Sequence, residues 1–270
     1  MIDDDELLVH WFGTTDPATP TLILLHGLTD SGLCWPDAIE RWSQDYRIAA
    51  VDALGHGRSR RFTATELETS PIAAMYAATL RLVGEISRGG THPVIAVGHS
   101  MGGGIAAALA GEPGLLRAVV LEEPAWLDDD ERDPETDAAE WISSVSDFRR
   151  DPSAALADGR AENPDWPAAE FEPWALAKRQ VDLGFLAVGE VVLSDPWTTL
   201  AARIAIPAHV VTGTRDVIMT KDKLAQLESF ENPRIHDSVI PGAGHCVRRD
   251  KSHEFHAIVD PWIAARFSSG

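Results

Sequence analysis

Short apolar runs alternate with helix-like segments along most of the chain. Seven of these runs have the apolar pattern of a buried or half-buried strand. They cover residues 7–12, 21–26, 47–52, 93–98, 116–121, 206–212 and 235–240. Strands that alternate with helices are typical of a mostly parallel sheet with helices on both faces. The pattern therefore predicts an α/β fold.

Two helices are indicated most clearly. The first begins at Ser70-Pro71, because serine is a preferred N-cap and proline is preferred in the first helical turn. Apolar residues recur at helical spacing over residues 72–86, and two glycines then end the pattern. The second helix carries an apolar stripe over residues 255–267, and Pro261 is expected to kink it. Both stripes are expected to pack into the core.

A long insertion separates the fifth and sixth predicted strands. The gap is roughly eighty residues, whereas a crossover helix needs only about a dozen. We expect a helical cap at residues 127–197, inserted into a core built from residues 1–126 and 198–270. Its helical stretches are expected around residues 137–148, 153–161 and 168–188. Loops at the carboxyl ends of parallel strands form the ligand pockets of open α/β sheets, so the cap is expected to cover the site.

Tryptophans are concentrated in or beside this insertion. Five of the nine in the chain fall there. Four of them are candidates for the wall of a substrate pocket: Trp126, Trp141, Trp166 and Trp174. A tryptophan can equally fill the hydrophobic core of the cap, and the sequence leaves that division open. The cluster favours an apolar or aromatic substrate.

Composition restricts the classes of function. The 270 residues, 44% of them hydrophobic, suffice for one or two domains with a large core. A balance of 23 basic against 42 acidic residues gives a net charge of −19, which argues against nucleic acid and anionic membrane partners. We therefore expect a small-molecule substrate, with no nucleic acid and no membrane partner. The oligomeric state stays open.

The sequence also bears on the compartment. Residues Met1 to Glu6 are acidic and lack the basic and apolar regions of a signal peptide. No apolar run approaches the roughly 20 residues that a membrane-spanning helix needs. Two cysteines, Cys34 and Cys246, are too few for a disulfide framework. These features predict a cytoplasmic protein.

The strongest chemical signal is Gly-His-Ser-Met-Gly-Gly at residues 98–103. It follows the predicted strand 93–98 and precedes an apolar helix-like run, so the pattern G-x-S-x-G lies in a strand–turn–helix context. Glycines flank the serine because larger side chains would clash in so sharp a turn. Such a turn presents the hydroxyl of Ser100 at the carboxyl end of the sheet. Ser100 is the expected nucleophile.

A serine hydroxyl needs a base, and the base needs a group that orients it. His245 follows a glycine-rich stretch after the last predicted strand and is the expected base. Asp216 follows the strand 206–212, so that serine, aspartate and histidine occur in the chain order of a known triad type. Glu123, at the end of the fifth predicted strand, is the alternative acid. We favour Asp216 and keep Glu123 open.

Two further stretches complete a resemblance to a known fold. Residues 21–28 form a strand that ends in His-Gly, and residues 48–59 form a strand followed by Gly-His-Gly-Arg-Ser. With the serine and histidine motifs, the chain resembles the α/β-hydrolase fold over nearly all of its length outside the cap. The resemblance implies that the backbone N–H groups of Leu28 and Met101 hold the oxyanion of a tetrahedral intermediate. The implied chemistry requires no cofactor and no metal.

The resulting hypothesis is a serine hydrolase of esterase or lactonase type, which cleaves a carboxylic ester or lactone through an acyl-enzyme. Other chemistries on the same triad stay open: carbon–carbon bond hydrolysis, amide hydrolysis and perhydrolysis. A receptor that keeps the triad and signals through cap movement is a further alternative. Epoxide hydrolases and haloalkane dehalogenases are excluded, because they have aspartate where this chain has Ser100.

Overall fold

The computed structural model describes residues 6–268, so residues 1–5, on which the expectation of no signal peptide mainly rests, lie outside it. Within the described part, seven strands form one sheet in the order β1-β3-β2-β4-β5-β6-β7. β1 pairs antiparallel with β3, and the other neighbours are parallel. The predicted α/β class and its seven strands are confirmed. Their bounds are β1 (Val9–Phe12), β2 (Thr21–Leu25), β3 (Arg47–Val51), β4 (Val94–His99), β5 (Ala118–Glu122), β6 (Ala208–Thr212) and β7 (Ile235–Val239).

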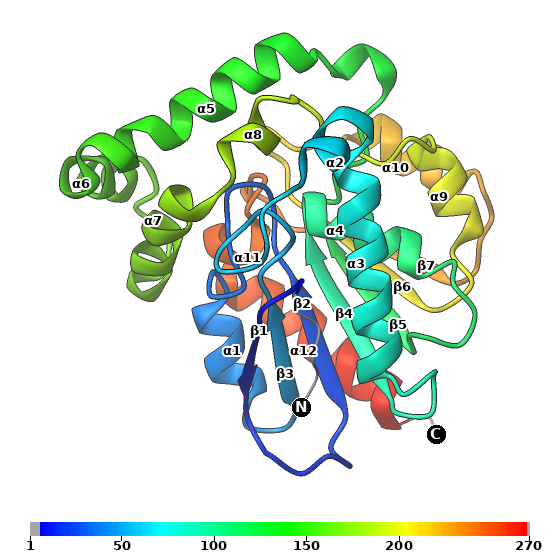
Figure 1. The fold of residues 1–270 in the computed structure, drawn as a ribbon. Helices are drawn as coiled ribbons and strands as arrows, with labels where there is room; N and C mark the ends of the chain where they lie inside the picture. Colours follow the sequence, from blue (N-terminus) through cyan, green and yellow to red (C-terminus); the bar gives the residue numbers. More distant parts are fainter. Residues whose placement is uncertain (1–5, 269–270) are drawn as a thin grey trace.

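Helices cover both faces of the sheet (Figure 1). Those of the core are α1 (Pro36–Trp42), α2 (Ala64–Thr69), α3 (Pro71–Ile86), α4 (Met101–Leu109), α9 (Trp197–Arg203), α10 (Lys221–Glu228), α11 (Val247–Asp250) and α12 (Ser252–Ser268). Among the helices described, none is both long enough and apolar enough to cross a lipid bilayer. Residues 6–268 also contain no group of three or more His, Cys, Asp or Glu side chains arranged to hold a metal ion.

Helices α3 and α12 form where the sequence predicts them. The Ser70 hydroxyl accepts a hydrogen bond from the amide of Ala73, and Pro71 occupies the first turn of α3, where its missing N–H leaves no helical bond unmade. α12 continues through Pro261 as far as Ser268. Both helices pack the apolar stripes seen in the sequence against the core, with some stripe residues buried and the others half-buried.

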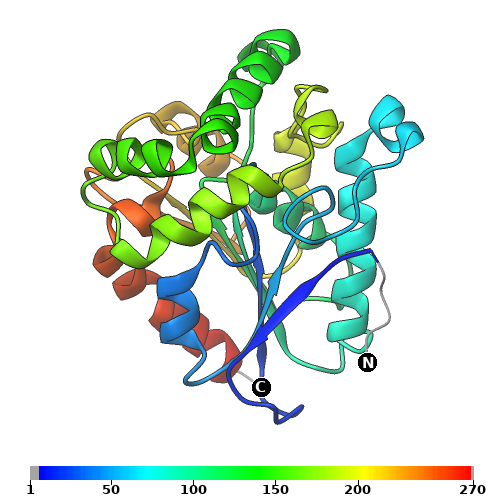
Figure 2. The same cartoon turned by 60° about the vertical axis from the view of Figure 1, so that its left-hand side comes forward.

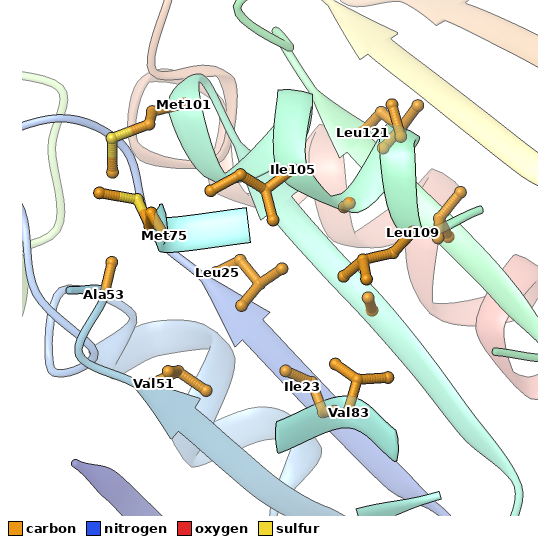
Figure 3. Close-up of a cluster of buried hydrophobic side chains, with 14 of the residues drawn as sticks. Ile23, Leu25, Val51, Ala53, Met75, Val83, Met101, Ile105, Leu109 and Leu121 are labelled. Carbon is orange, nitrogen blue, oxygen red and sulfur yellow. The ribbon is translucent and has the colours of Figure 1, made fainter. Parts of the chain in front are cut away.

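The sheet separates two hydrophobic layers, because neighbouring residues of a strand point to opposite faces. Ile23 and Leu25 of β2 belong to the layer under α3 and α4, and Leu22 and Leu24 belong to the layer under α1 and α12. Figure 3 shows the first layer, which includes Met101 at the start of α4. Apolar packing therefore fixes the start of α4, directly after the proposed nucleophile, against the sheet.

The remaining helices lie between β5 and α9, and we refer to residues 127–197 as the cap. They lie over the end of the sheet at which β4 runs into α4, with α5 across that end and α6 and α7 to one side (Figures 1 and 2). The third predicted helix of this segment is divided into η2, α7 and α8. The bounds are η1 (Asp129–Glu131), α5 (Pro134–Arg150), α6 (Pro152–Glu162), η2 (Ala168–Glu170), α7 (Phe171–Gln180) and α8 (Leu183–Leu186).

Candidate active site

Ser100 occupies the sharp turn between β4 and α4. Its backbone is left-handed, with φ +53° and ψ −117°, which is a strained conformation for a residue with a side chain. A Cβ on Gly98 would collide with the backbone of Gly102, and a Cβ on Gly102 would collide with the carbonyl group of Leu25. The two glycines of the motif therefore allow the turn to form and to lie against β2.

The two expected oxyanion donors, the backbone amides of Leu28 and Met101, lie on segments that adjoin Ser100. A Cβ on Gly27 would lie 3.1 Å from the Cβ of Ser100, so the loop that carries Leu28 lies directly against the serine. The amide of Met101 is in the first turn of α4, where backbone N–H groups have no partner within the helix. The same helix end provides a positive electrostatic potential. That these two amides hold an oxyanion stays a prediction.

The imidazole of His245 lies next to a buried carboxylate. Its Nδ1 is 3.3 Å from Oε2 of Glu123, whose side chain is fully buried. β4 and β5 pair as far as His99 and Glu122. Ser100 and Glu123 are the next residues, so both lie at the same end of adjacent strands. A carboxylate on Nδ1 leaves Nε2, the other ring nitrogen, available to accept a proton.

Glu123 has three hydrogen-bond donors besides His245. The Thr212 hydroxyl and the Met219 amide donate to Oε1, and the Ile218 amide donates to Oε2 from 2.7 Å. The backbone of Glu123 is left-handed, with φ +45°, and this conformation lies at the end of β5 where the chain turns away from the sheet. Together the donors fix the carboxylate in one orientation toward the imidazole.

Asp216, the acid favoured from the sequence, lies elsewhere. It is exposed, in the loop after β6. That loop presents the amides of Ile218 and Met219 to Glu123, so it supplies hydrogen-bond donors to the acid and not the carboxylate itself. The structure therefore differs from the preference for Asp216 and places the alternative acid, Glu123, next to His245.

His99 links the strand of the serine to the loop of the base. Its Nε2 lies 3.0 Å from the carbonyl oxygen of His245, and the centroids of the two rings are 4.9 Å apart. A carbonyl oxygen only accepts, so Nε2 of His99 carries the proton and donates it. Burial, together with repulsion from a protonated His245, holds the pKa of His99 well below its usual value. His99 is thus a neutral ring with a structural role.

Polar residues around the loop of Leu28 are also structural. The amide of Ala53 donates to Nε2 of His26 from 3.0 Å, which ties the start of this loop to the segment after β3. Asp52 accepts hydrogen bonds from the amides of Gly32 and Arg58 at 2.8 and 2.9 Å. These bonds fix the loop to the segment after β3, and they occupy groups that could otherwise take part in acid–base chemistry.

A cavity of about 180 Å³ lies beside Met101. Ala125, whose amide donates to the carbonyl of Ser100 at 2.9 Å, lines it too. The cavity therefore adjoins the turn of the proposed nucleophile, but Ser100, Leu28 and His245 themselves do not line it. Its wall comes from α4, from the segment after β5 and from the segment that leads into α9. Apolar residues such as Ile105, Leu193 and Leu200 form one part of it, and the charged residues Asp128, Asp129, Arg132 and Asp195 form another.

The tryptophans divide between this cavity and the cap. Trp126 lines the cavity and stacks on Trp197, with 5.4 Å between the ring centroids. Trp174 packs in the small hydrophobic cluster of α5, α6 and α7, and Trp166 donates its indole N–H to a carboxylate of α11. Trp141 packs against the main core. Of the four candidate pocket residues, Trp126 lines this cavity. The other three pack within the cap or between the cap and the core.

Comparisons with known proteins agree with this fold. Residues 22–258 match the model of the alpha/beta hydrolase family. Lipase LipV of Mycobacterium tuberculosis is 33% identical over 121 residues, which are 44% of this chain and 42% of that protein. E-2-(acetamidomethylene)succinate hydrolase has a similar structure, with a TM-score of 0.75 and 19% identity over 96% of this chain and 95% of the other. The enol-lactonase of Burkholderia xenovorans LB400 gives a TM-score of 0.65 and 21% identity over 96% of each chain.

These comparisons differ in what they establish. The two solved structures, at about one fifth identity, show the same fold. The matched segments span between 23% and 42% of the length of the curated relatives. The family model covers most of the chain, from β2 into α12, and includes the serine turn and the His245 loop. The chain therefore belongs to the alpha/beta hydrolase family.

Proposed function

We propose that this family member is a serine hydrolase that cleaves a carboxylic ester or lactone of a small, apolar substrate through an acyl-enzyme. The observation that carries the proposal is the His245 imidazole, held at Nδ1 by the buried Glu123, at the sheet end where Ser100 occupies a strained turn. The similarity to a lipase and the structural likeness to an enol-lactonase support the choice of reaction.

Each residue of the site has one role in this reaction. The Ser100 hydroxyl attacks the acyl carbon while Nε2 of His245 accepts its proton. The N–H groups of Leu28 and Met101 stabilise the negative charge that develops on the carbonyl oxygen. The imidazolium then protonates the leaving alcohol, and the same imidazole later takes a proton from the water that hydrolyses the acyl-enzyme. Glu123 keeps Nδ1 protonated and stabilises the imidazolium.

Two measurements test the proposal: turnover of a panel of substrates, and labelling by a serine-reactive probe. We expect turnover of nitrophenyl esters or lactones, together with stoichiometric labelling by a fluorophosphonate, because only an activated serine attacks phosphorus readily. The panel also contains amides and a diketone, whose preferential cleavage would indicate amide or carbon–carbon bond hydrolysis. A protein that is not labelled and hydrolyses no ester or lactone would contradict the proposal.

The size of the cavity beside Met101 is expected to limit the length of the substrate's acyl or alkyl chain. A second cavity, of about 340 Å³, adjoins the first, because Leu193, Ser194, Asp195 and Leu200 line both. Leu200 is the largest apolar side chain of α9 that contributes to both walls. Leu200→Ala is expected to connect them, so that longer acyl or alkyl chains fit. Relative kcat/KM should then rise by up to about fourfold per added methylene, since burial of one methylene gives about 0.8 kcal/mol.

A leucine in the cap core provides the matched control for this test. Leu156 packs against the hydrophobic cluster of α5, α6 and α7 and lines neither cavity. Leu156→Ala is expected to lower the melting temperature and to leave the chain-length profile of nitrophenyl esters unchanged. If both variants shift the profile equally, or neither does, the cavity is not the site of the substrate chain.

A further inference from the structure

Several charged side chains are buried between the cap and the core. We call four of them the buried ion cluster: Asp30, Glu170, Lys178 and Arg249; a fifth, Arg248, lies 3.7 Å from Glu170 and adjoins the cluster. Glu170 and Lys178 come from the cap elements η2 and α7. Arg249, in α11, donates to Glu170 Oε2 at 2.8 Å and to Asp30 Oδ2 at 2.9 Å. Lys178 Nζ lies 3.5 Å from Oδ1 of Asp30. Each of the four is at most 8% exposed, so the cluster is closed to solvent.

The cluster reaches the turn that carries Leu28. Nζ of Lys178 donates a hydrogen bond to the hydroxyl of Thr29, the residue after Leu28. The amide of Asp30 donates to the carbonyl of Gly27 at 3.2 Å, which closes the turn. Thr29 has a φ of +62°, a conformation that is strained for a β-branched residue. Such strain persists only where the surroundings hold the residue in place.

Burial of four charges is not the most stabilising way to attach a cap. Desolvation opposes it, and apolar side chains of similar volume often give equal or greater stability. Burial on its own would raise the pKa of Asp30, but the charges of Arg249 and Lys178 hold this pKa well below its usual range, so the carboxylate stays charged. Charged hydrogen bonds add direction, which apolar contacts lack. The ammonium of Lys178 has Thr29 and Asp30 on one side, and lies 5.1 Å from the ring centroid of Trp174.

We propose that Lys178 and Thr29 are positioning residues for the oxyanion hole. Through the Lys178–Thr29 hydrogen bond, the cap helix α7 holds the turn in the conformation that directs the Leu28 N–H at the reacting carbonyl oxygen. This inference rests on the proposed function, because it requires an oxyanion at Leu28. It gives the cap a part in the chemical step as well as in substrate binding: when α7 is undocked, the turn loses its support and the reaction slows.

Two substitutions remove the bond from either side. Lys178→Met keeps the apolar stem and removes the ammonium, and Thr29→Val keeps the shape and removes the hydroxyl. Each is expected to lower kcat about tenfold to a hundredfold with KM almost unchanged, because the donor is displaced and not lost; full loss of one donor lowers the rate about 10²–10³-fold. Since both remove the same bond, the double variant should be no slower than the slower single variant. The rate of fluorophosphonate labelling should fall in parallel.

Two controls separate positioning from a loss of stability. Thr29→Ser keeps the hydroxyl and is expected to retain the wild-type kcat. Lys223→Met removes another buried ammonium, one that binds the carbonyl of Trp126 at 2.7 Å and the carboxylate of Glu131, neither of which belongs to the turn at Thr29. This variant is expected to unfold at a lower temperature and to keep its kcat.

Several results would overturn the inference. The first is an unchanged kcat in Lys178→Met, and the second is a rise in KM without a fall in kcat in Lys178→Met or Thr29→Val. The third is a Thr29→Ser enzyme that is as slow as Thr29→Val. Should Lys178→Met fail to fold, the pair Thr29→Val and Thr29→Ser decides the question. Failure of the proposed function is recognised separately, because the wild type would then neither hydrolyse esters or lactones nor react with the fluorophosphonate.

Discussion

Replacement of Ser100 by alanine is expected to lower kcat on a nitrophenyl ester by about 10⁶-fold, the loss that follows removal of the nucleophile from a serine hydrolase triad. Without the hydroxyl, His245 has no group to deprotonate and no acyl-enzyme forms. Alanine keeps the Cβ, so its contacts with the loop of Gly27 stay the same. We expect the melting temperature to stay near the wild-type value, which a comparison of thermal unfolding would verify.

Labelling with a fluorophosphonate gives the direct control. The probe is expected to modify Ser100 in the wild type and to leave Ser100→Ala unmodified. Ser144 lies exposed in α5, and its hydroxyl bonds to the carbonyl of Trp141 at 2.8 Å, so Ser144→Ala should be labelled like the wild type. Persistent labelling or turnover in the Ser100→Ala protein would show that a different nucleophile operates.

The sheet could be predicted from the sequence because each strand has a local signal. β4, predicted over residues 93–98, is observed at Val94–His99, and six of the seven strands pair in parallel as the strand–helix alternation implies. The cap was harder to predict in detail. Its helical stretches are apparent, but the division of the third at Val181, where the backbone is extended, depends on packing that local sequence does not encode.

The identity of the acid depends on tertiary geometry. β5 and β6 are adjacent and parallel, so Glu123 and Asp216 both follow strands that end at the same edge of the sheet. A residue before proline is usually extended, and Glu123 precedes Pro124, yet its φ is +45°. This unusual turn directs the carboxylate toward His245, and no short sequence pattern signals it.

Side-chain direction in and beside the cap likewise depends on tertiary packing. Trp166 and Trp174 are as suitable for a pocket wall as Trp126. In the structure, however, Trp174 packs in the cap core and Trp166 bonds to α11. Trp197, at the start of α9, lines the cavity instead. Which side of a short helix faces the site depends on how the cap docks. That docking involves Lys178 and Arg249, whose roles become visible only when the cap and the core are seen together.

The second large effect is expected at the triad acid. Glu123→Gln keeps the shape of the side chain but removes the negative charge that stabilises the imidazolium of His245. We expect kcat to fall by about 10⁴-fold, as it does when the acid of a serine triad becomes an amide. An amide also cannot accept from every donor that the carboxylate now satisfies at Thr212, Ile218 and Met219, so a modest loss of stability is expected as well.

Asp216→Asn is the matched control for this substitution. It makes the same chemical change at an exposed carboxylate in the loop after the neighbouring strand β6, so kcat should stay within a few-fold of the wild type. Measured on one ester, with the labelling rate as a second readout, the two variants distinguish the two acids. The reverse order, with Asp216→Asn slower by orders of magnitude and Glu123→Gln nearly unaffected, would mean that Asp216 moves to the imidazole in the working enzyme. The observed contact of 3.3 Å between Glu123 and His245 predicts the first order.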